Sequence, residues 1–357
     1  METGTVTVKA ALVVDDAVGE RRRVLLDSDG RPFRLEIERW SEQQARARLD
    51  EVWWGRATAR LPGGAGWFVD LGGETGVIEA TKSAAIVEGG LISVRIKSEA
   101  WSNKGPSLSL FNLTAATPRP DRPERHAPAP EDVFLSGVEI VDQHDGADAR
   151  REIDAAIGEA LHPVVSIPGG GDIAIEHTRA LTTVDVDAAD RTGPGANYVR
   201  DLNLAAGAEA ARQISLRGIA GLVVVDFLTM ASRKDRETVA AHLRDALGLR
   251  LGRASDVGEI TRFGLCEASI ARRQRPISDA LGTGAEREAL DAIRMIETEG
   301  QSARGARIHA RVSPEAARWL ETDVIGWKKA LADRIGARWH VEVASGPHEA
   351  PDVWSAR

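Results

Sequence analysis

The sequence contains a single cysteine, Cys266, and this scarcity limits the chemistry available to the chain. One thiol cannot form a disulfide framework or a cysteine zinc site within one chain, so we expect neither. Positive charge is also in the minority, because 46 Lys and Arg stand against 54 Asp and Glu for a net charge of -8. That balance argues against a wholly basic nucleic-acid coat, but it permits a local basic groove.

Long hydrophobic runs are missing as well. No apolar run approaches the ~18 residues of a membrane-spanning helix, and the N-terminus lacks the charged-then-apolar pattern of a signal peptide. We therefore expect a soluble, cytoplasmic protein. Its 357 residues, 43% of them hydrophobic, are sufficient for two or three domains with a sizeable core.

Short apolar segments separated by glycine turns fill the region from about residue 50 to residue 110. The candidate strands are 52–61, 66–71, 76–79, 91–96 and 105–110. This pattern fits a small barrel of the OB type, a fold often used to bind single-stranded nucleic acid. Phe68 and Trp67 could stack on bases while Lys104 contacts phosphate. The alternative, equally open for Phe68, is that these aromatics fill the barrel.

Two later segments, 180–187 and 221–227, combine an apolar run with carboxylates and predict buried strands. The side-chain period of two places Asp185 and Asp187 on the same face of the first strand. Residues 199–216 between them have helical spacing. A strand, helix, strand order makes the two strands neighbours in one sheet, which would bring Asp185, Asp187 and Asp226 together.

Three carboxylates at one sheet edge repel each other unless a divalent cation lies among them, and hard oxygen ligands favour magnesium or manganese. Aspartate at a strand end is also common for a plainer reason, because it caps helices and starts turns. Arg262 and Arg272 follow in the chain and could supply positive charge for a phosphodiester. For Arg272 the alternative is a solvated, charged helix end.

The rest of the chain gives its organisation. An antiparallel β opening is predicted around 5–13 and 32–38, a proline-rich linker at 118–130, a strand at 133–141 and a helix at 150–161. Residues 285–357 predict a compact α/β unit with helices at 286–297, 314–320 and 326–335 and strands at 306–312 and 337–343. We find no catalytic constellation in this last unit.

Several stretches, taken in chain order, resemble the ribonuclease E/G family of bacterial endoribonucleases. The stretches are 68–72, 103–105, 168–185, 203–206, 211–227 and 261–265. The resemblance implies an α/β (α+β multidomain) protein in which an OB-fold barrel is inserted in an abbreviated RNase H-like region. The implied units are the N-terminal part of that region (1–45), the barrel (46–112), a Pro-rich linker (113–131), the remainder of the region (132–170), a DNase I-like catalytic subdomain (171–277) and a small C-terminal domain (285–357).

The resemblance also implies an activity, which is magnesium-dependent cleavage of single-stranded RNA. Asp185 and Asp226 fall on the family's two metal-binding aspartates, and manganese could replace magnesium. Asp187 stands where the family has an asparagine, and its extra charge could tighten the cation or repel the scissile phosphate. Phe68 and Lys104 fall on barrel positions that contact RNA, and Arg262 lies in the matching block after the second aspartate.

Two further departures from the family pattern bear on function. The interval that would hold a pocket for a 5′-monophosphate is shortened to the proline linker and a short β–α piece. Residues 279–284, where the family's zinc-linking cysteines belong, contain none, so we expect no zinc and at most a homodimer without a zinc link. An RNA-binding regulator without turnover is therefore the alternative function, and a DNA-directed nuclease is a weaker one.

Overall fold

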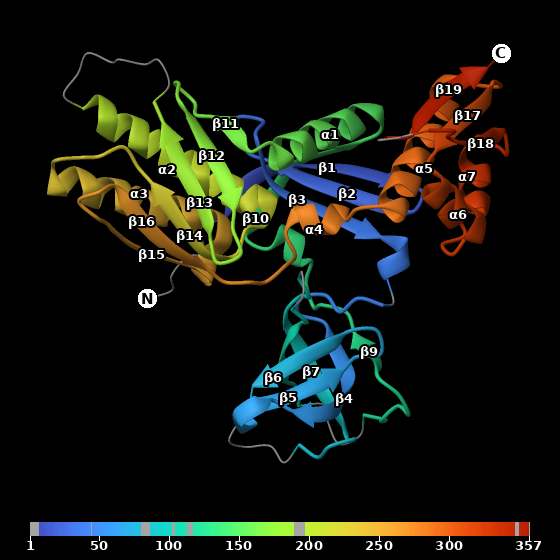
Figure 1. Ribbon diagram of the computed structural model, residues 1–357, viewed down its shortest axis with the longest axis horizontal. Coiled ribbons are helices and arrows are strands. Elements are labelled where there is room, and N and C mark those ends of the chain that lie inside the picture. The colour runs from blue at the N-terminus through green and yellow to red at the C-terminus, as the bar shows by residue number, and fades with distance from the viewer. Residues whose placement is uncertain are drawn as a thin grey trace.

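A computed structural model describes residues 7–43, 45–79, 86–101, 104–112, 117–188, 197–346 and 350–356. The described residues form four sheets, and helices pack against the N-terminal, central and C-terminal sheets. Figure 1 shows the barrel projecting from the rest of the molecule, with a large central sheet at one end and the C-terminal domain at the other. The described helices include none long and apolar enough to cross a membrane.

The N-terminal sheet has the strand order β10-β1-β2-β3. Its strands are β1 (Val8–Ala17), β2 (Glu20–Leu26), β3 (Pro32–Arg39) and β10 (Val138–Asp145), and β10 runs parallel to β1. Helix α1 (Ala147–Leu161) buries its apolar side against this sheet. Three of these strands precede the barrel in sequence and one follows it, so the barrel is inserted into this unit.

Strand β2 is the element of this sheet that the hydrophobic pattern does not reveal. It begins Glu-Arg-Arg-Arg, yet Arg22 and Arg23 are buried. Their guanidinium groups are matched by carboxylates from distant segments, with Arg22 3.1 Å from Asp291 and Arg23 paired with Asp132. Because buried charge requires such partners, only the tertiary structure makes this strand stable.

The barrel closes from five strands, as the sequence predicts. They are β4 (Val52–Arg60), β5 (Gly66–Asp70), β6 (Thr75–Glu79), β7 (Leu91–Ser98) and β8 (Ser107–Leu110), in the order β5-β6-β8-β7-β4 with β4 pairing back to β5. The proline-rich stretch is extended and contributes β9 (Glu124–Ala127), which pairs with β4.

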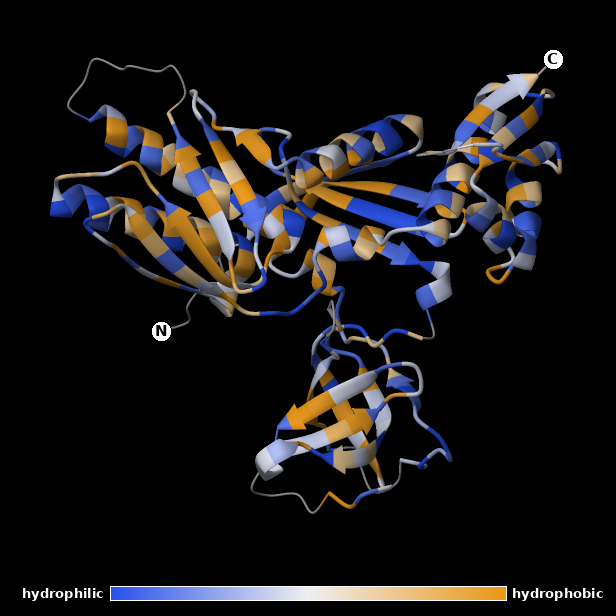
Figure 2. Cartoon of the chain, in the orientation of Figure 1, coloured by the Kyte–Doolittle hydropathy of each residue, from blue (hydrophilic) through white to orange (hydrophobic). Residues whose placement is uncertain are grey.

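The central sheet has the order β11-β12-β13-β14-β16-β15. Its strands are β11 (Val164–Ser166), β12 (Asp172–His177), β13 (Thr182–Asp187), β14 (Gly221–Asp226), β15 (Ser255–Ile260) and β16 (Leu265–Ile270). Helices α2 (Tyr198–Arg217) and α3 (Arg233–Leu251) cover one face and form the largest core cluster with it. Figure 2 shows the hydrophobic residues alternating along these strands. The opposite face, called the open face below, carries exposed side chains.

Cys266 lies in the middle of this sheet and provides a probe of its stability. Its side chain is fully buried on β16, and burial raises the pKa of the thiol to about 11. A thiol that is both inaccessible and protonated is a poor nucleophile. We expect native protein at pH 8 to resist thiol-specific reagents for hours and unfolded protein to react within minutes. Rapid labelling of the native protein would contradict the buried position.

The remaining elements form the link and the C-terminal domain. Helix α4 (Ile277–Leu281) leads to α5 (Ala285–Ser302), α6 (Pro314–Thr322) and α7 (Trp327–Ile335), which pack on a sheet of β17 (Arg307–Val312), β18 (Trp339–Val343) and β19 (Asp352–Ala356). Short 3-10 turns occur at Trp40–Glu42, Pro62–Gly64, Val133–Leu135 and Gly252–Ala254. Of the helices and strands after residue 284, the sequence predicted all but β19, and it did not predict α4.

Candidate active site

The structure brings Asp185 and Asp226 together on the open face. Strands β13 and β14 run parallel, and Asp185 is the register partner of Asp226 at their C-terminal ends. Both carboxylates are exposed, whereas their neighbours Val184, Val186 and Val225 are buried against the helices. Adjacent strands lie about 4.8 Å apart, so two carboxylates at paired positions can reach the same ion.

Asp187 shares this face but does not join the pair. It lies two residues further along β13, opposite Asp172 on the neighbouring strand β12. Among the described residues there is no group of three or more His, Cys, Asp or Glu side chains placed to hold one metal ion. The described residues thus show a pair of carboxylates and no cluster of three, and the role of Asp187 as a third ligand or an orienting residue stays a prediction.

The chain that follows Asp226 is held in place by a buried asparagine. Asn203 on α2 is fully buried, and its Nδ2 donates to the carbonyl oxygen of Leu228 at 2.8 Å. Its Oδ1 accepts from the backbone N–H of Leu228 at 3.1 Å. Asn203 belongs to a motif that the sequence singled out without a role. The structure supplies the role, which is to fix the end of the strand that carries Asp226.

A tight turn at residues 261–264, between β15 and β16, presses against the same strand end. The backbone N–H of Phe227 donates to the carbonyl oxygen of Gly264 at 3.1 Å. Gly264 has φ +100°, and a Cβ there would lie 2.3 Å from the Phe227 carbonyl oxygen and 3.4 Å from Asp226 Oδ1. Only glycine fits this position, so the turn that carries Arg262 is seated directly beside Asp226.

The open face around the two aspartates is strongly acidic. Four further carboxylates share this face through strand alternation and register, and they are Asp172, Glu176, Asp187 and Glu267. A surface of this charge repels a phosphate backbone unless a cation neutralises it. Two exposed carboxylates with room for water or substrate oxygen suit magnesium, which is usually held by one or two carboxylates. The donor set therefore fits the ion that the sequence implied.

The barrel meets the central sheet at a groove of about 890 Å³, called the junction groove below. Barrel residues Trp101 and Lys104 line one side, and Thr182 and Leu222 on β13 and β14 line the other. His177 also lines it, and burial together with the Arg217 charge lowers the pKa of that imidazole. Leu222 is on the same face as Asp226, about 13 Å along the strand. The groove therefore lies toward the opposite end of β13 and β14 from the two aspartates, with Lys104 on its barrel side.

The predicted barrel contacts separate into different roles. Trp67 is 8% exposed within the barrel core, with the Arg60 guanidinium over its ring, so the prediction that it stacks on bases is wrong. Phe68 points the other way on β5 and is half-buried. The period of two along a strand explains the difference, because neighbouring side chains face opposite sides of the barrel wall. The described lining of the junction groove includes neither residue.

Arg272 is an anchor between barrel and sheet. Its Nε and Nη2 donate to Ser98 Oγ at 3.3 and 3.2 Å, and Nη2 also donates to the Gly105 carbonyl oxygen at 3.0 Å. The solvated position considered for it is therefore wrong, and its donors are largely committed to the barrel. It still lines the junction groove beside Lys104.

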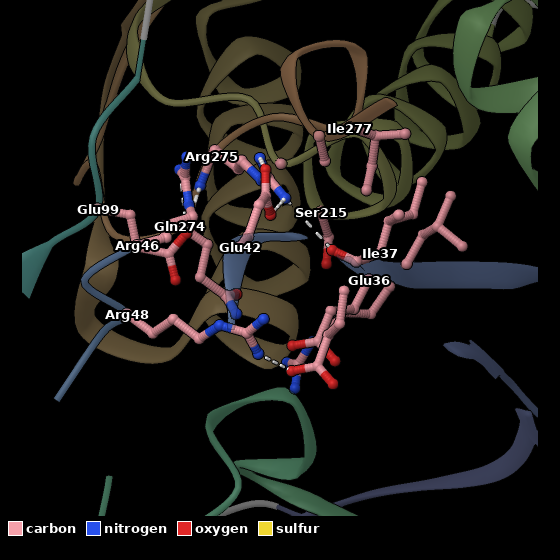
Figure 3. Close-up of a pocket in the computed structure, with 15 residues that line it drawn as sticks. Glu36, Ile37, Glu42, Arg46, Arg48, Glu99, Ser215, Gln274, Arg275 and Ile277 are labelled. Atoms are coloured by element: carbon pink, nitrogen blue, oxygen red, sulfur yellow. Dashed lines mark hydrogen bonds and ion pairs between the residues drawn. The ribbon is translucent and has the colours of Figure 1, made fainter. Parts of the chain in front are cut away.

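A second, smaller cavity of about 70 Å³ marks the joint between barrel and N-terminal sheet. Arginines and glutamates line this cavity, and Arg275, Glu42, Arg46, Arg48 and Glu99 are among those labelled in Figure 3. Arg275 donates to Glu42 at 2.5 and 2.7 Å, and Arg48 pairs with Glu38. Glu99 of the barrel lies 3.6 Å from Arg46. These mutual pairings describe a structural joint that fixes the barrel relative to the sheets.

Residues 279–284 are the segment where the resemblance would place zinc-linking cysteines and where the sequence has none. The carbonyl oxygen of Leu281 accepts from Arg39 Nη2, and a Cβ at Gly282 would lie 3.0 Å from Arg39 Nη1. This segment is thus packed on strand β3.

Comparison with known proteins bears on the central part of the chain. The model of the Ribonuclease E/G family matches residues 130–275. That range includes β10, α1 and the whole central sheet, and therefore both paired aspartates, the buried asparagine and the turn beside Asp226.

Curated relatives agree with this match. Ribonuclease E of Haemophilus influenzae is 29% identical over 235 residues, which cover 62% of this chain and 24% of that protein. Ribonuclease E of a Nostoc species is 41% identical over 132 residues, or 36% of this chain and 19% of the relative. Ribonuclease E of Escherichia coli is 33% identical over 184 residues, or 47% and 17%. The chain thus spans less than a quarter of the length of these relatives, and its similarity to the Ribonuclease E/G family lies in residues 130–275.

Proposed function

We propose that this protein is an endoribonuclease that cleaves single-stranded RNA with magnesium held by Asp185 and Asp226. The observation that carries the proposal is the register pairing of these two exposed carboxylates at the ends of parallel strands, within the segment that matches the family. The relatives are named ribonuclease E, and their activity is extended to this chain as part of the proposal.

Each part of the chain has a physical task in this proposal. Asp185 and Asp226 would hold the ion. When bound, the ion would lower the pKa of a water molecule bound to it and offset the negative charge that develops on the phosphate. Asn203 and the Gly264 turn keep Asp226 in place without competing for its carboxylate. Asp187 would add negative potential near the ion as an orienting residue. Lys104 would contact backbone phosphates at the junction groove, which makes binding dependent on salt.

The barrel supports an RNA substrate. Its strand order, with β6 parallel to β8 and β4 closing on β5, is that of an OB-type barrel, a fold that binds single strands through exposed aromatics and cations. Phe68 is available for this role on the outward side of β5, and Lys104 is exposed. The units on either side would correspond to the RNase H-like and DNase I-like regions of the family.

The test is cleavage of a labelled single-stranded, A/U-rich RNA by the full chain, with magnesium and with EDTA. We expect cutting in magnesium or manganese and none in EDTA. Substrates with a 5′-phosphate and a 5′-hydroxyl should be cut at equal rates, because the interval for a 5′-monophosphate pocket is shortened. A duplex RNA and a single-stranded DNA of the same sequence serve as matched substrates. Cutting that persists in EDTA would contradict the metal role.

A non-catalytic RNA-binding regulator is the second candidate. The observation that favours it is Asp187, which stands where the family has an asparagine and adds negative charge on the face that carries Asp185 and Asp226. Binding of RNA without cleavage in either metal would establish this function instead.

A further inference from the structure

We propose that Phe263 is a stacking platform for a nucleobase next to the scissile phosphate. The inference rests on the proposed function and adds a specific contact to it. Phe263 is 66% exposed, while every other phenylalanine, tryptophan and tyrosine of the chain is buried or half-buried. A ring that is 66% exposed buries little apolar area, so it contributes little packing energy to the fold and most of its surface can contact a ligand.

The turn that carries Phe263 is rigid. Thr261 Oγ1 accepts from the backbone N–H groups of Phe263 and Leu265 at 3.3 and 3.2 Å. The carbonyl oxygen of Thr261 accepts from Gly264 N–H at 3.1 Å, and Thr261 N–H donates to Leu265 at 2.9 Å. An exposed ring on an ordered turn loses little conformational entropy when a ligand stacks on it, which is what a binding platform requires.

The turn is also joined to the candidate active site. Leu265, two residues after Phe263, is the register partner of Asp226, and Gly264 lies against the Asp226 carboxylate. Leu265 is itself 39% exposed on the open face. The ring is therefore held within one short turn of the residue proposed to hold the metal, and a base stacked there would belong to a nucleotide close to the cut.

Arg262 gives the platform a charged neighbour. Its guanidinium carbon lies 4.6 Å from the centre of the Phe263 ring, so the cation covers one face of the aromatic group. In this proposal the other face takes the base, as in single-strand binding proteins, which stack bases on aromatic rings and add cation–π contacts from arginine. On an otherwise acidic face, Arg262 also provides a positive charge for the adjoining phosphate.

Binding measurements separate stacking from charge. In an Asp185→Asn background, which prevents turnover, a single-stranded RNA is titrated against Phe263→Ala, Phe263→Leu and Phe263→Trp at several salt concentrations. We expect Phe263→Ala to weaken binding about 5- to 150-fold without changing the salt slope, and Phe263→Trp to restore it. Leucine should restore little, because it lacks a π face. Arg262→Gln should instead reduce the salt slope by about 0.7.

A base-specific readout identifies the contact itself. An RNA carrying 2-aminopurine at successive positions should lose fluorescence at one position on binding, and that quenching should disappear in Phe263→Ala. Val324→Ala, at an equally exposed apolar residue of the C-terminal domain, is the matched control and should change nothing.

The outcomes distinguish this inference from the proposed function. Equal RNA affinity and quenching in wild type and Phe263→Ala, with cleavage intact, would overturn the platform alone. Failure of the wild-type chain to bind or cut RNA would overturn the proposed function and the platform together.

Discussion

Substitution Asp226→Asn is expected to reduce the cleavage rate constant by at least about 1,000-fold, which corresponds to ~4 kcal/mol of transition-state stabilisation. The amide keeps the size and hydrogen-bonding capacity of the side chain but removes the negative charge that would hold the ion. Asp185→Asn should behave in the same way, because the two residues are register partners on adjacent strands. Steady-state cleavage of a labelled single-stranded RNA in magnesium measures the effect.

Two measurements accompany this prediction. RNA affinity in EDTA should stay the same or rise, because the substitution removes negative charge from an acidic face. Glu267→Gln is the control, because it removes one charge from an exposed position on the same face, two residues from Leu265, the register partner of Asp226. Its cleavage rate should stay within about threefold of wild type. A rate above a tenth of wild type in Asp226→Asn, or a loss of RNA binding together with cleavage, would contradict the assigned role.

Substitution Glu209→Ala is expected to lower the free energy of unfolding by about 3 to 5 kcal/mol. Glu209 on α2 is fully buried and accepts from Arg212 at 2.5 and 3.1 Å and from Arg31 at 2.7 Å. Arg212 also contacts the Pro32 carbonyl oxygen and Glu159 of α1. Removal of Glu209 leaves the buried Arg212 guanidinium partly uncompensated, and it loosens the helix that supports the aspartate-bearing strands.

Denaturant unfolding monitored by circular dichroism measures this loss. Glu237→Ala on α3 is the matched control, because Glu237 pairs with Arg233 at 2.8 Å on the protein surface. Exposed pairs of this spacing contribute about 0.3 to 0.5 kcal/mol. Ordinary surface substitutions change the free energy of unfolding by no more than about 0.5 kcal/mol each. If the two variants differ in that free energy by less than about 1 kcal/mol, the buried network is contradicted.

The same network gives stability a pH dependence. Burial alone would raise the pKa of Glu209, but hydrogen bonds and charge from Arg212 and Arg31 outweigh it and hold the pKa below its ordinary value of 4.5. A carboxyl with a depressed folded-state pKa contributes stability above its unfolded pKa and loses it as pH falls through the folded value. Wild-type stability should therefore decline below pH 4.5, and Glu209→Ala should lack this part of the decline.

Much of the candidate site could be predicted from residues alone. Alternation along 182–187 determined that Asp185 and Asp187 share a face, and a strand, helix, strand order determined that Asp226 lies on the neighbouring strand. Both are local or topological rules, because the period of a strand and the handedness of a crossover do not depend on the rest of the fold. The closed barrel was predictable in the same way from its turns and short strands.

The tertiary structure decided what depends on distant partners. Register, which no local pattern specifies, paired Asp226 with Asp185 and left Asp187 outside the pair. Barrel closure determined that Trp67 is core and Phe68 surface, and barrel docking turned Arg272 into an anchor. Strand β2 exists because carboxylates from other segments neutralise its arginines. Composition and periodicity therefore determined the barrel strands and the order of the aspartate-bearing strands, whereas burial and charge pairing between remote segments decided which side chains remain exposed.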